Sequence, residues 1–377
     1  MIRRFSITTA VPFAVAVVCS SLLLIVACGT PSDPPGASAT PSASASASTP
    51  LVPALDAAID AALADAGDLD DAADAGDLDG GPLDDPMANH LETREELLAL
   101  FTIKRPPKRD SNADGFLDKS FGVGTAAKIN QGNKLLGKHA ISKAKCLAGL
   151  AGTTIQTEEQ RATCGGFENM VPIHKKGKKP KVCIDVFEFP DKPCELPVVW
   201  VAPVQAKVIC ELQGKRLCAQ EEWITACRGD PDDGKDQRFA YGDEMDLDVC
   251  NTNKPAAKLG PNCDPDSAAT AWKTCSTNTE PTGAFPRCKS RFGVFDQHGN
   301  VAEIMTRADP DGHTYSQLKG SAFFYVDVAR KPDERQVKGR ETYPDQCAHD
   351  PRWHVEPMNE AWHVNYHLGF RCCKSVK

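Results

Sequence analysis

Sixteen cysteines are spread along this 377-residue chain, and they constrain its fold more than any other feature. So many thiols are unusual in a reducing cytosol, whereas an oxidising compartment lets them pair. Two of them, Cys19 and Cys28, lie within or directly after an apolar N-terminal segment. The remaining fourteen are an even number, so seven disulfides can form with no thiol left over. We therefore expect a loop-rich domain, stapled by disulfides, outside the cytoplasm.

The N-terminus resembles a bacterial lipoprotein signal. A basic start leads into the apolar run Val11–Ala27, and Cys28 follows small and β-branched residues. The run is too short, and Gly29 too disruptive, for a spanning helix. The resemblance implies removal of residues 1–27 and a diacylglycerol on Cys28, which would anchor the chain to membrane lipid. Gly29 after the lipidated cysteine favours the outer membrane; an uncleaved membrane anchor is the alternative.

Residues 28–90 form a linker of low complexity. A Ser/Ala/Pro/Thr-rich stretch precedes an Asp/Ala-rich one, and positions 33–85 hold twelve Asp and neither Lys nor Arg. Such a composition cannot bury enough apolar surface to offset the entropy of ordering, so we expect a disordered tether.

The charge of the rest of the chain excludes one class of partner. Removing the twelve linker aspartates and the two N-terminal arginines from the net charge of −8 leaves about +2 for residues 87–377. A nearly neutral domain has no overall positive field that would attract a polyanion, so we expect no nucleic-acid partner.

Residues 91–180 are an extension that the sequence defines poorly. His90–Leu100 can form one short amphipathic helix. Asp110–Gly115 reads D-x-N-x-D-G, with oxygens at the alternate positions that a calcium loop uses. Its twelfth position is Phe121 instead of the bidentate Glu, so an abbreviated calcium loop and a plain turn both stay open.

Regular elements become predictable from Lys181 onward. The apolar segments Val182–Phe189 and Leu196–Val201 predict strands. Pro203–Gln213 predicts a helix, because Pro suits the first turn and Gly214 the C-terminal stop.

Several short motifs then follow in a fixed order. They are Gly214–Trp223 (GKRLCAQEEW), Ala226–Gly229 (ACRG), Phe292–Glu303 (FGVFDQHGNVAE), Lys319–Ser321 (KGS) and Gly369–Cys372 (GFRC). In this order they resemble the sulfatase-modifying factor family, the formylglycine-generating enzyme superfamily. The resemblance implies an α+β, loop-rich, modified C-type-lectin-like fold over residues 181–377. Cys218 and the doubled Cys372-Cys373 are similar to a cysteine-rich, secreted bacterial subgroup.

The resemblance also implies what the catalytic site should contain. Formylglycine-generating enzymes oxidise a substrate cysteine with oxygen and copper, held by two thiols that lie three and eight residues after a motif serine. Counting from Ser321 gives Phe324 and Ala329, and no cysteine occurs between Cys288 and Cys347. Neither residue can bind copper, so we expect no catalytic residues and neither copper nor iron.

Two classes of function remain open. The first is a binding or repurposed module for an unknown peptide, protein or glycan ligand. The alternative is a formylglycine-generating oxidoreductase or a non-heme metal oxygenase that acts on protein cysteine or a small thiol.

Calcium is the cofactor that the resemblance favours. The family's ligand positions in the G-N-V-x-E block are filled by Asp296, Gly299, Val301 and Glu303, and hard oxygen donors suit this ion. In the alternative, Asp296 caps a turn and Glu303 is a solvated charge.

The resemblance implies two disulfides, Cys210–Cys372 and Cys227–Cys347. We further expect Cys146 and Cys164 to pair locally, and the other eight cysteines stay unassigned.

Four histidines gather near the C-terminus: His349, His354, His363 and His367. The last two are spaced i, i+4, as two metal ligands on one helical face would be. Their segment alternates aromatic and polar residues, which favours a loop or strand and histidines without a metal.

Overall fold

A computed structural model describes residues 84–104, 113–230, 234, 236–252, 263, 267–324, 346–349 and 354–376. These belong to one compact unit that spans Gly76–Lys377. The expected signal, the lipidation site Cys28, Asp110–Asn112 and Ala329 lie outside the described residues. No helix in the described ranges is both long and apolar enough to cross a bilayer.

The N-terminal part of the unit is built from short helices. They are the 3-10 helix η2 (Pro86–Asn89), α2 (Arg94–Ala99), α3 (Ala113–Ser120), α4 (Lys143–Leu150) and α5 (Glu158–Thr163). Helix α2 is the helix expected over His90–Leu100, and it starts at Thr93, whose side chain forms a capping box with Glu96. The expected linker end at residue 90 is too late, because Asn89 and His90 are already buried.

The expected extension 91–180 packs into the same core as the rest of the unit. Leu97 from α2 and Leu117 from α3 lie in one apolar cluster with Phe121 and Phe370. Phe121 is only 1% exposed, so the twelfth position of the D-x-N-x-D-G stretch is a core residue. Its Asp114 and Gly115 lie in the first turn of α3.

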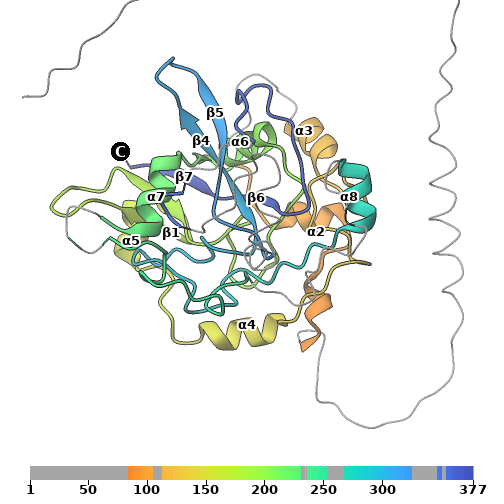
Figure 1. Cartoon of the computed structure of the whole chain (residues 1–377), viewed down its shortest axis with the longest axis horizontal. Coiled ribbons are helices and arrows are strands. Elements are labelled where there is room, and N and C mark those ends of the chain that lie inside the picture. The colour runs from red at the N-terminus through yellow and green to blue at the C-terminus, as the bar shows by residue number, and fades with distance from the viewer. Residues whose placement is uncertain are drawn as a thin grey trace, which may run out of the picture. The chain divides into compact units, whose positions relative to one another are not determined.

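Two small sheets form the centre of the molecule (Figure 1). The first has the order β1 (Met170–Ile173), β2 (Val182–Asp185), β7 (Cys372–Ser375), β3 (Arg216–Leu217), and all neighbours are antiparallel. The second has the order β5 (Thr314–Lys319), β4 (Ala302–Ala308), β6 (Leu368–Phe370), where β4 and β6 are parallel. The β4–β5 hairpin projects from the body (Figure 1).

Three further helices follow: α6 (Pro203–Leu212), α7 (Gln220–Arg228) and α8 (Ala268–Thr274). Helices α6 and α7 pack against the sheets, and α8 lies at the edge of the unit (Figure 1). Helix α6 confirms the expected helix, with Pro203 in its first turn and Gly214 at φ 75° after its end. Strand β2 is four residues shorter than the expected strand, Val182–Phe189. Mixed helices and sheets of this kind make the fold α+β.

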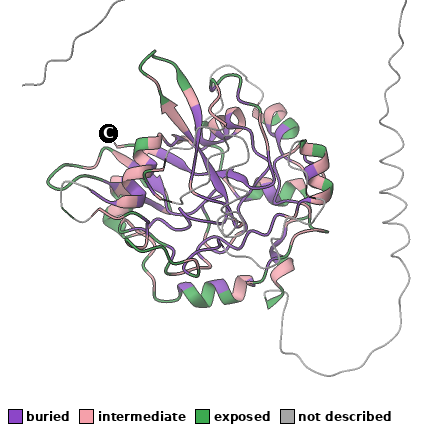
Figure 2. Cartoon of the chain, viewed as in Figure 1, coloured by how far each residue is buried: buried purple, intermediate pink, exposed green. Residues whose placement is uncertain are grey.

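The strand expected over Leu196–Val201 is wrong. The segment is buried, but it joins neither sheet and makes one isolated bridge, from Val199 to Asn130. Pro197 has no N–H for a ladder, and Trp200 has φ 59°, which turns the backbone out of an extended path. The apolar run is therefore a core loop, and Figure 2 shows the burial concentrated in the centre of the unit.

Seven disulfides join all fourteen cysteines after Cys28. They are Cys146–Cys194, Cys164–Cys183, Cys210–Cys372, Cys218–Cys373, Cys227–Cys347, Cys250–Cys288 and Cys263–Cys275. Two of these are the pairs that the family resemblance implies, Cys210–Cys372 and Cys227–Cys347.

The expected local pair Cys146–Cys164 is wrong, because Cys146 bonds to Cys194, 48 residues away, and Cys164 bonds to Cys183, 19 residues away. Cys146 lies on α4, and its disulfide joins α4 to Cys194. Cys194 is held in turn by its N–H, which donates to the Thr282 carbonyl at 2.9 Å. Cys164 ends α5, which packs on β1, and β1 pairs with β2, the strand that carries Cys183. The pairing of β1 with β2 therefore determines that Cys164 bonds to Cys183.

Candidate functional site

The G-N-V-x-E block forms a buried turn that leads into β4. Gly299 has φ 76°, and a Cβ there would stand 2.3 Å from the Asn251 carbonyl oxygen, so only glycine fits. Asn300 N–H donates to that same carbonyl at 2.9 Å. Gly299 N–H donates to Ser321 Oγ at 2.9 Å. The motif serine therefore holds the turn in place.

Arg371 stands between β6 and β7 and fastens the two sheets together. Its guanidinium donates to both Glu303 carboxylate oxygens at 2.6 Å, and Trp223 Nε1 donates to one of them at 2.9 Å. The remaining Arg371 N–H groups donate to the main-chain carbonyls of Asp185 and Val186, at the end of β2, and of Phe295. Arg371 is fully buried, and each of its N–H groups has a partner inside the protein.

Two further carboxylates lie at this centre. Glu188 is fully buried and accepts from Asn300 Nδ2 at 2.6 Å and from Val301 N–H at 3.0 Å. Asp296, 2% exposed and at φ 57°, accepts from Gly283 N–H at 2.6 Å. We call Glu188, Asp296, Glu303 and Arg371 the buried charge cluster. Three carboxylates face one guanidinium, so fully ionised groups would leave two negative charges unbalanced.

The pKa values in the buried charge cluster reflect this excess. Burial, and then the charges of Asp296 and Glu303, raise the pKa of Glu188 well above its ordinary value. Burial raises the pKa of Asp296 from 3.8 to about 7, against the lowering effects of the Gly283 N–H and Arg371. Burial opposes the charge of Arg371, but Glu303 outweighs it and raises the pKa of the guanidinium. The cluster therefore holds protons or attracts a cation.

The donors fit a calcium ion in kind and in charge. Asp296 supplies a carboxylate, Gly299 and Val301 supply carbonyls, and the surplus negative charge suits a divalent ion. Glu303 is committed to Arg371 and Trp223, so it lies at the site as a partner of the guanidinium. Asp296 is then the family ligand position whose carboxylate is held by a single main-chain N–H.

The region after Ser321 holds aromatic rings at the position where the family resemblance implies the first thiol. Phe324 meets His367 with ring centroids 5.0 Å apart and Tyr366 at 6.0 Å. Phe323, directly before it, is fully buried, and its N–H donates to the Asn300 carbonyl at 3.1 Å. Every cysteine in the described ranges is part of a disulfide. No thiol there is free to bind copper.

Three of the C-terminal histidines gather beside this aromatic cluster. His354 and His363 stack with ring centroids 4.1 Å apart, and both lie close enough to His367 that their protonation would disfavour its own. Burial lowers the pKa of His367 to about 3 and that of His354 to about 4, so the imidazoles are neutral. The segment that holds His363 and His367 is not helical, as the sequence indicates. The three donor nitrogens do not converge on one point in the described structure.

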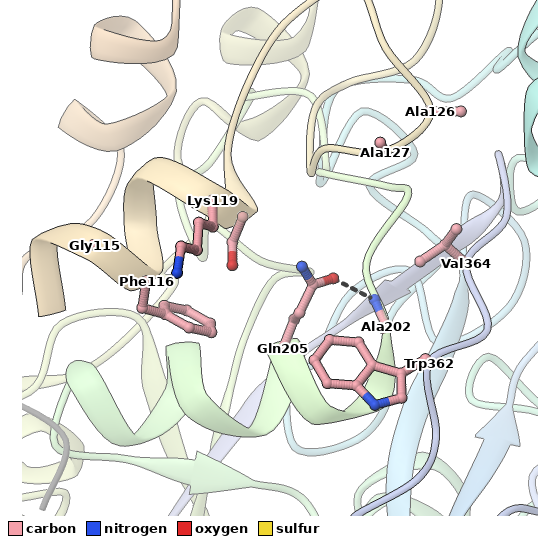
Figure 3. A pocket seen from close by; sticks show the side chains of 10 residues that line it. Gly115, Phe116, Lys119, Ala126, Ala127, Ala202, Gln205, Trp362 and Val364 are labelled. Atoms are coloured by element: carbon pink, nitrogen blue, oxygen red, sulfur yellow. Dashed lines mark hydrogen bonds between the residues drawn. The ribbon is translucent and has the colours of Figure 1, made fainter. Parts of the chain in front are cut away.

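A cavity of about 590 Å³ lies close to the same cluster (Figure 3). Phe116 and Lys119 of α3 line one side, and Trp362 and Val364 line the other, near the start of α6. Val364 and Phe324 both pack against the apolar cluster that contains Tyr366. Trp362 is 64% exposed, which is unusual for such a large apolar ring.

Sequence reasoning missed Glu188, Arg371 and the cavity. Glu188 had a usable signal, since a charged residue inside the apolar run Val186–Phe189 needs an internal partner. Arg371 stands within the GFRC motif, but nothing in the sequence names Glu303 as its partner. The cavity joins three segments that are far apart in the sequence, and no periodicity reveals such a meeting.

The comparison with protein families now gives the class of protein. Residues 154–376, more than half of the chain, match the sulfatase-modifying factor enzyme 1-like (FGE-sulfatase) domain. The chain belongs to this family. The match begins at residue 154, before the start at 181 expected from the motifs.

Individual relatives are more distant. Mouse inactive C-alpha-formylglycine-generating enzyme 2 is 27% identical over 183 residues, which cover 48% of this chain and 50% of the mouse protein. The chain thus spans about half the length of that relative. The crystal structure of CarF aligns with 43% of this chain and 47% of its own, at 18% identity and a TM-score of 0.27. A TM-score this low carries no argument.

Proposed function

We propose that this chain is a lipid-anchored protein of the bacterial cell envelope whose sulfatase-modifying-factor-like domain binds a ligand and does not perform copper-thiolate catalysis. The observation that carries the proposal is Phe324, an aromatic ring packed against Tyr366 and His367 at the position of the family's first thiol. The name of the mouse relative calls that protein inactive, which is in keeping with the proposal.

The anchor is proposed from the sequence. Cys28 follows a lipoprotein-like apolar segment, and the long Asp-rich linker would hold the domain away from the bilayer. A labelled fatty acid should appear in the wild-type chain and be absent from Cys28→Ser. The wild type should fractionate with outer membranes, and the variant should not. Equal labelling of both chains would remove the anchor from the proposal.

The cavity of Figure 3 supports a peptide as the ligand. Its walls are mainly apolar and include the rings of Trp362 and Phe116, with the exposed Lys119 also lining it. An aliphatic side chain of the peptide would fill the cavity, and an acidic neighbour would pair with Lys119. An exposed tryptophan beside a cavity is typical of a binding hot spot.

An array of short peptides with one aliphatic and one acidic residue, probed with the full chain, tests this. We expect binding to fall at least tenfold in Trp362→Ala and to weaken in Lys119→Glu. Leu135→Ala is the matched control, because Leu135 is 94% exposed and does not line the cavity. Binding that survives Trp362→Ala, or that falls equally in the control, contradicts the peptide site.

Calcium is proposed as a structural ion beside the buried charge cluster. The support is the surplus of two negative charges and the fit of Asp296 with the carbonyls of Gly299 and Val301. The ion would neutralise that surplus and leave the Arg371–Glu303 pair undisturbed.

An oxidoreductase is the second candidate, and one observation favours it. Within the described structure, the buried His363 Nε2 and His367 Nδ1 have no hydrogen-bond partner, and His367 touches Phe324. A local rearrangement could bring these neutral imidazoles onto an iron ion. Elemental analysis of protein purified without chelator decides between the candidates: calcium without iron or copper supports the binding module, and stoichiometric iron supports an oxygenase.

A further inference from the structure

The Cys227–Cys347 disulfide faces a buried imidazole. His298 Nε2 lies 3.4 Å from Cys227 Sγ and 3.8 Å from Cys347 Sγ, and all three residues are fully buried. Among the residues that the structure describes, this is the only group of three or more Cys, His, Asp or Glu side chains whose ligand atoms all lie within 4.8 Å of one another. The arrangement lies outside the buried charge cluster and outside the cavity.

The surroundings fix the tautomer of His298 and the position of its ring. Ala240 N–H donates to Nε2 at 2.9 Å, so this nitrogen carries the lone pair and Nδ1 carries the proton. The rings of Phe239 and Tyr241 stand edge-on to the imidazole, with centroids 5.7 and 5.5 Å away. The nitrogen that is able to bind a metal is therefore the one next to the two sulfurs.

We propose that opening the Cys227–Cys347 bond creates a binding site for one thiophilic metal ion, held by two thiolates and His298 Nε2. In a tetrahedral site with metal–sulfur bonds of about 2.3 Å and metal–nitrogen bonds of about 2.0 Å, donor atoms lie roughly 3.5–3.8 Å apart. The two sulfur–nitrogen distances, 3.4 and 3.8 Å, are close to this spacing. The two sulfurs have to separate, which requires the disulfide between them to open.

The chemistry is a two-electron exchange followed by ligation. A dithiol reductant transfers two electrons and two protons to the disulfide, which gives two cysteine thiols and the oxidised, disulfide form of the reductant. The metal then displaces the two thiol protons, and the imidazole exchanges its Ala240 hydrogen bond for the metal. The disulfide and the metal exclude each other, so the site responds to the redox state of its surroundings.

The donor set selects Cu(I) over Zn(II). Thiolates are soft ligands that prefer Cu(I) or Zn(II), and structural zinc sites almost always have four protein ligands. The described residues supply three. Other disulfides have no such donor: the polar group next to Cys372 Sγ is the amide of Gln213 at 3.6 Å, and Cys288 Sγ faces the His298 carbonyl at 3.5 Å.

The test uses the full chain, kept folded under argon. It is treated with dithiothreitol, desalted and supplied with Cu(I) or, in a second arm, Zn(II). Bound metal is measured after a second desalting, and free thiols are located by alkylation and mass spectrometry. We expect one Cu(I) per chain, bound at least tenfold more tightly than Zn(II), with Cys227 and Cys347 protected from alkylation only when copper is present. His298→Gln should bind Cu(I) at least tenfold more weakly.

X-ray absorption at the copper edge keeps the proposal open to refutation even if His298→Gln fails to fold. The wild-type protein must show two sulfur ligands and one nitrogen ligand. A Cys227–Cys347 bond that stays closed while the chain is folded overturns the proposal. Copper with sulfur ligands alone, equal retention by His298→Gln, or Zn(II) bound as tightly as Cu(I) overturns it as well.

Discussion

The Gly299–Glu303 turn and the segment that begins at Ser321 are in direct contact, yet they relate to the rest of the family in opposite ways. The turn keeps the motif residues, with a glycine that nothing else can replace and a glutamate bound by Arg371. The neighbouring segment keeps the serine, which accepts from Gly299 N–H, and then has aromatic Phe324 where the family resemblance implies a thiol. The structure shows the motif's role in folding, and the loss of its role in catalysis is part of our proposal.

The comparison shows how the two roles separate. The turn joins buried groups from both sheets, so a change there leaves a charge or a donor without a partner. The segment after Ser321 contributes the rings of Phe323 and Phe324 to aromatic contacts, where side-chain volume matters more than charge. A change of side chain there should therefore disturb the fold less than a change in the turn.

The largest expected effect comes from breaking the turn's link to Arg371. Arg371→Gln leaves Glu303 buried beside two other carboxylates, and we expect a loss of roughly 3–5 kcal/mol in the free energy of unfolding. Urea unfolding with the disulfides intact measures it. Arg307→Gln is the control, since its pair with Asp309 is about one-third exposed and should cost less than about 1 kcal/mol. Similar losses of unfolding free energy in both variants would contradict a structural role of the buried charge cluster.

Calcium should act next most strongly, and in a pH-dependent way. The pKa of Asp296 is about 7 in the folded protein and 3.8 as its ordinary value, so the metal-free protein loses stability as the pH rises from about 4 to 7. Calcium binds the carboxylate form, so its stabilisation should grow from pH 5 to 8. It should reach roughly 2.7 kcal/mol at a hundredfold excess over Kd.

Thermal unfolding with calcium or a chelator at pH 5 and pH 8 measures this effect. Asp296→Asn should abolish the calcium response and flatten the pH dependence. A calcium response that is the same at both pH values, or that persists in Asp296→Asn, would place the ion elsewhere.

Phe324→Ala sharpens the comparison on the other side. Phe324 is half-buried against Tyr366 and His367, so we expect a loss of about 1–2 kcal/mol, below the 3–5 kcal/mol of a fully buried Phe. Guanidinium unfolding provides the value. If position 324 has no catalytic role, oxygen consumption with a cysteine peptide and copper should be equally absent in the wild type and the variant. Consumption by the wild type alone would contradict the account.

The smallest effect on stability should follow Trp362→Ala. Its ring is 64% exposed, so the free energy of unfolding should change by less than about 0.5 kcal/mol. Peptide binding should nevertheless fall. A large destabilisation would mean that Trp362 is a packing residue and that the cavity edge is not a docking surface.

The sequence predicts those parts of the fold that local signals determine. Pro203 and Gly214 bound α6 as expected, and the ordered motifs identify the family over residues 154–376. Local patterns fail where long-range packing decides. The apolar segment ending at Val201 became a core loop, and Cys164 follows the sheet to Cys183.

The candidate site was predictable to a similar extent. The motif singles out Asp296 and Glu303, which the structure places in the buried charge cluster, and the replacement of the first thiol by Phe324 stays a prediction. The binding of Glu303 to Arg371, and the imidazole beside Cys227, depend on segments that meet only in the folded chain. No pattern within one segment carries that information.

The most direct measurement is a thiol titration with Ellman's reagent. The full chain with Cys19→Ser and Cys28→Ser is purified without reductant, denatured and titrated. The account predicts no free thiol, because all fourteen remaining cysteines are paired. Any titratable thiol in the protein as purified would contradict it, since at least one of the seven disulfides would then be open.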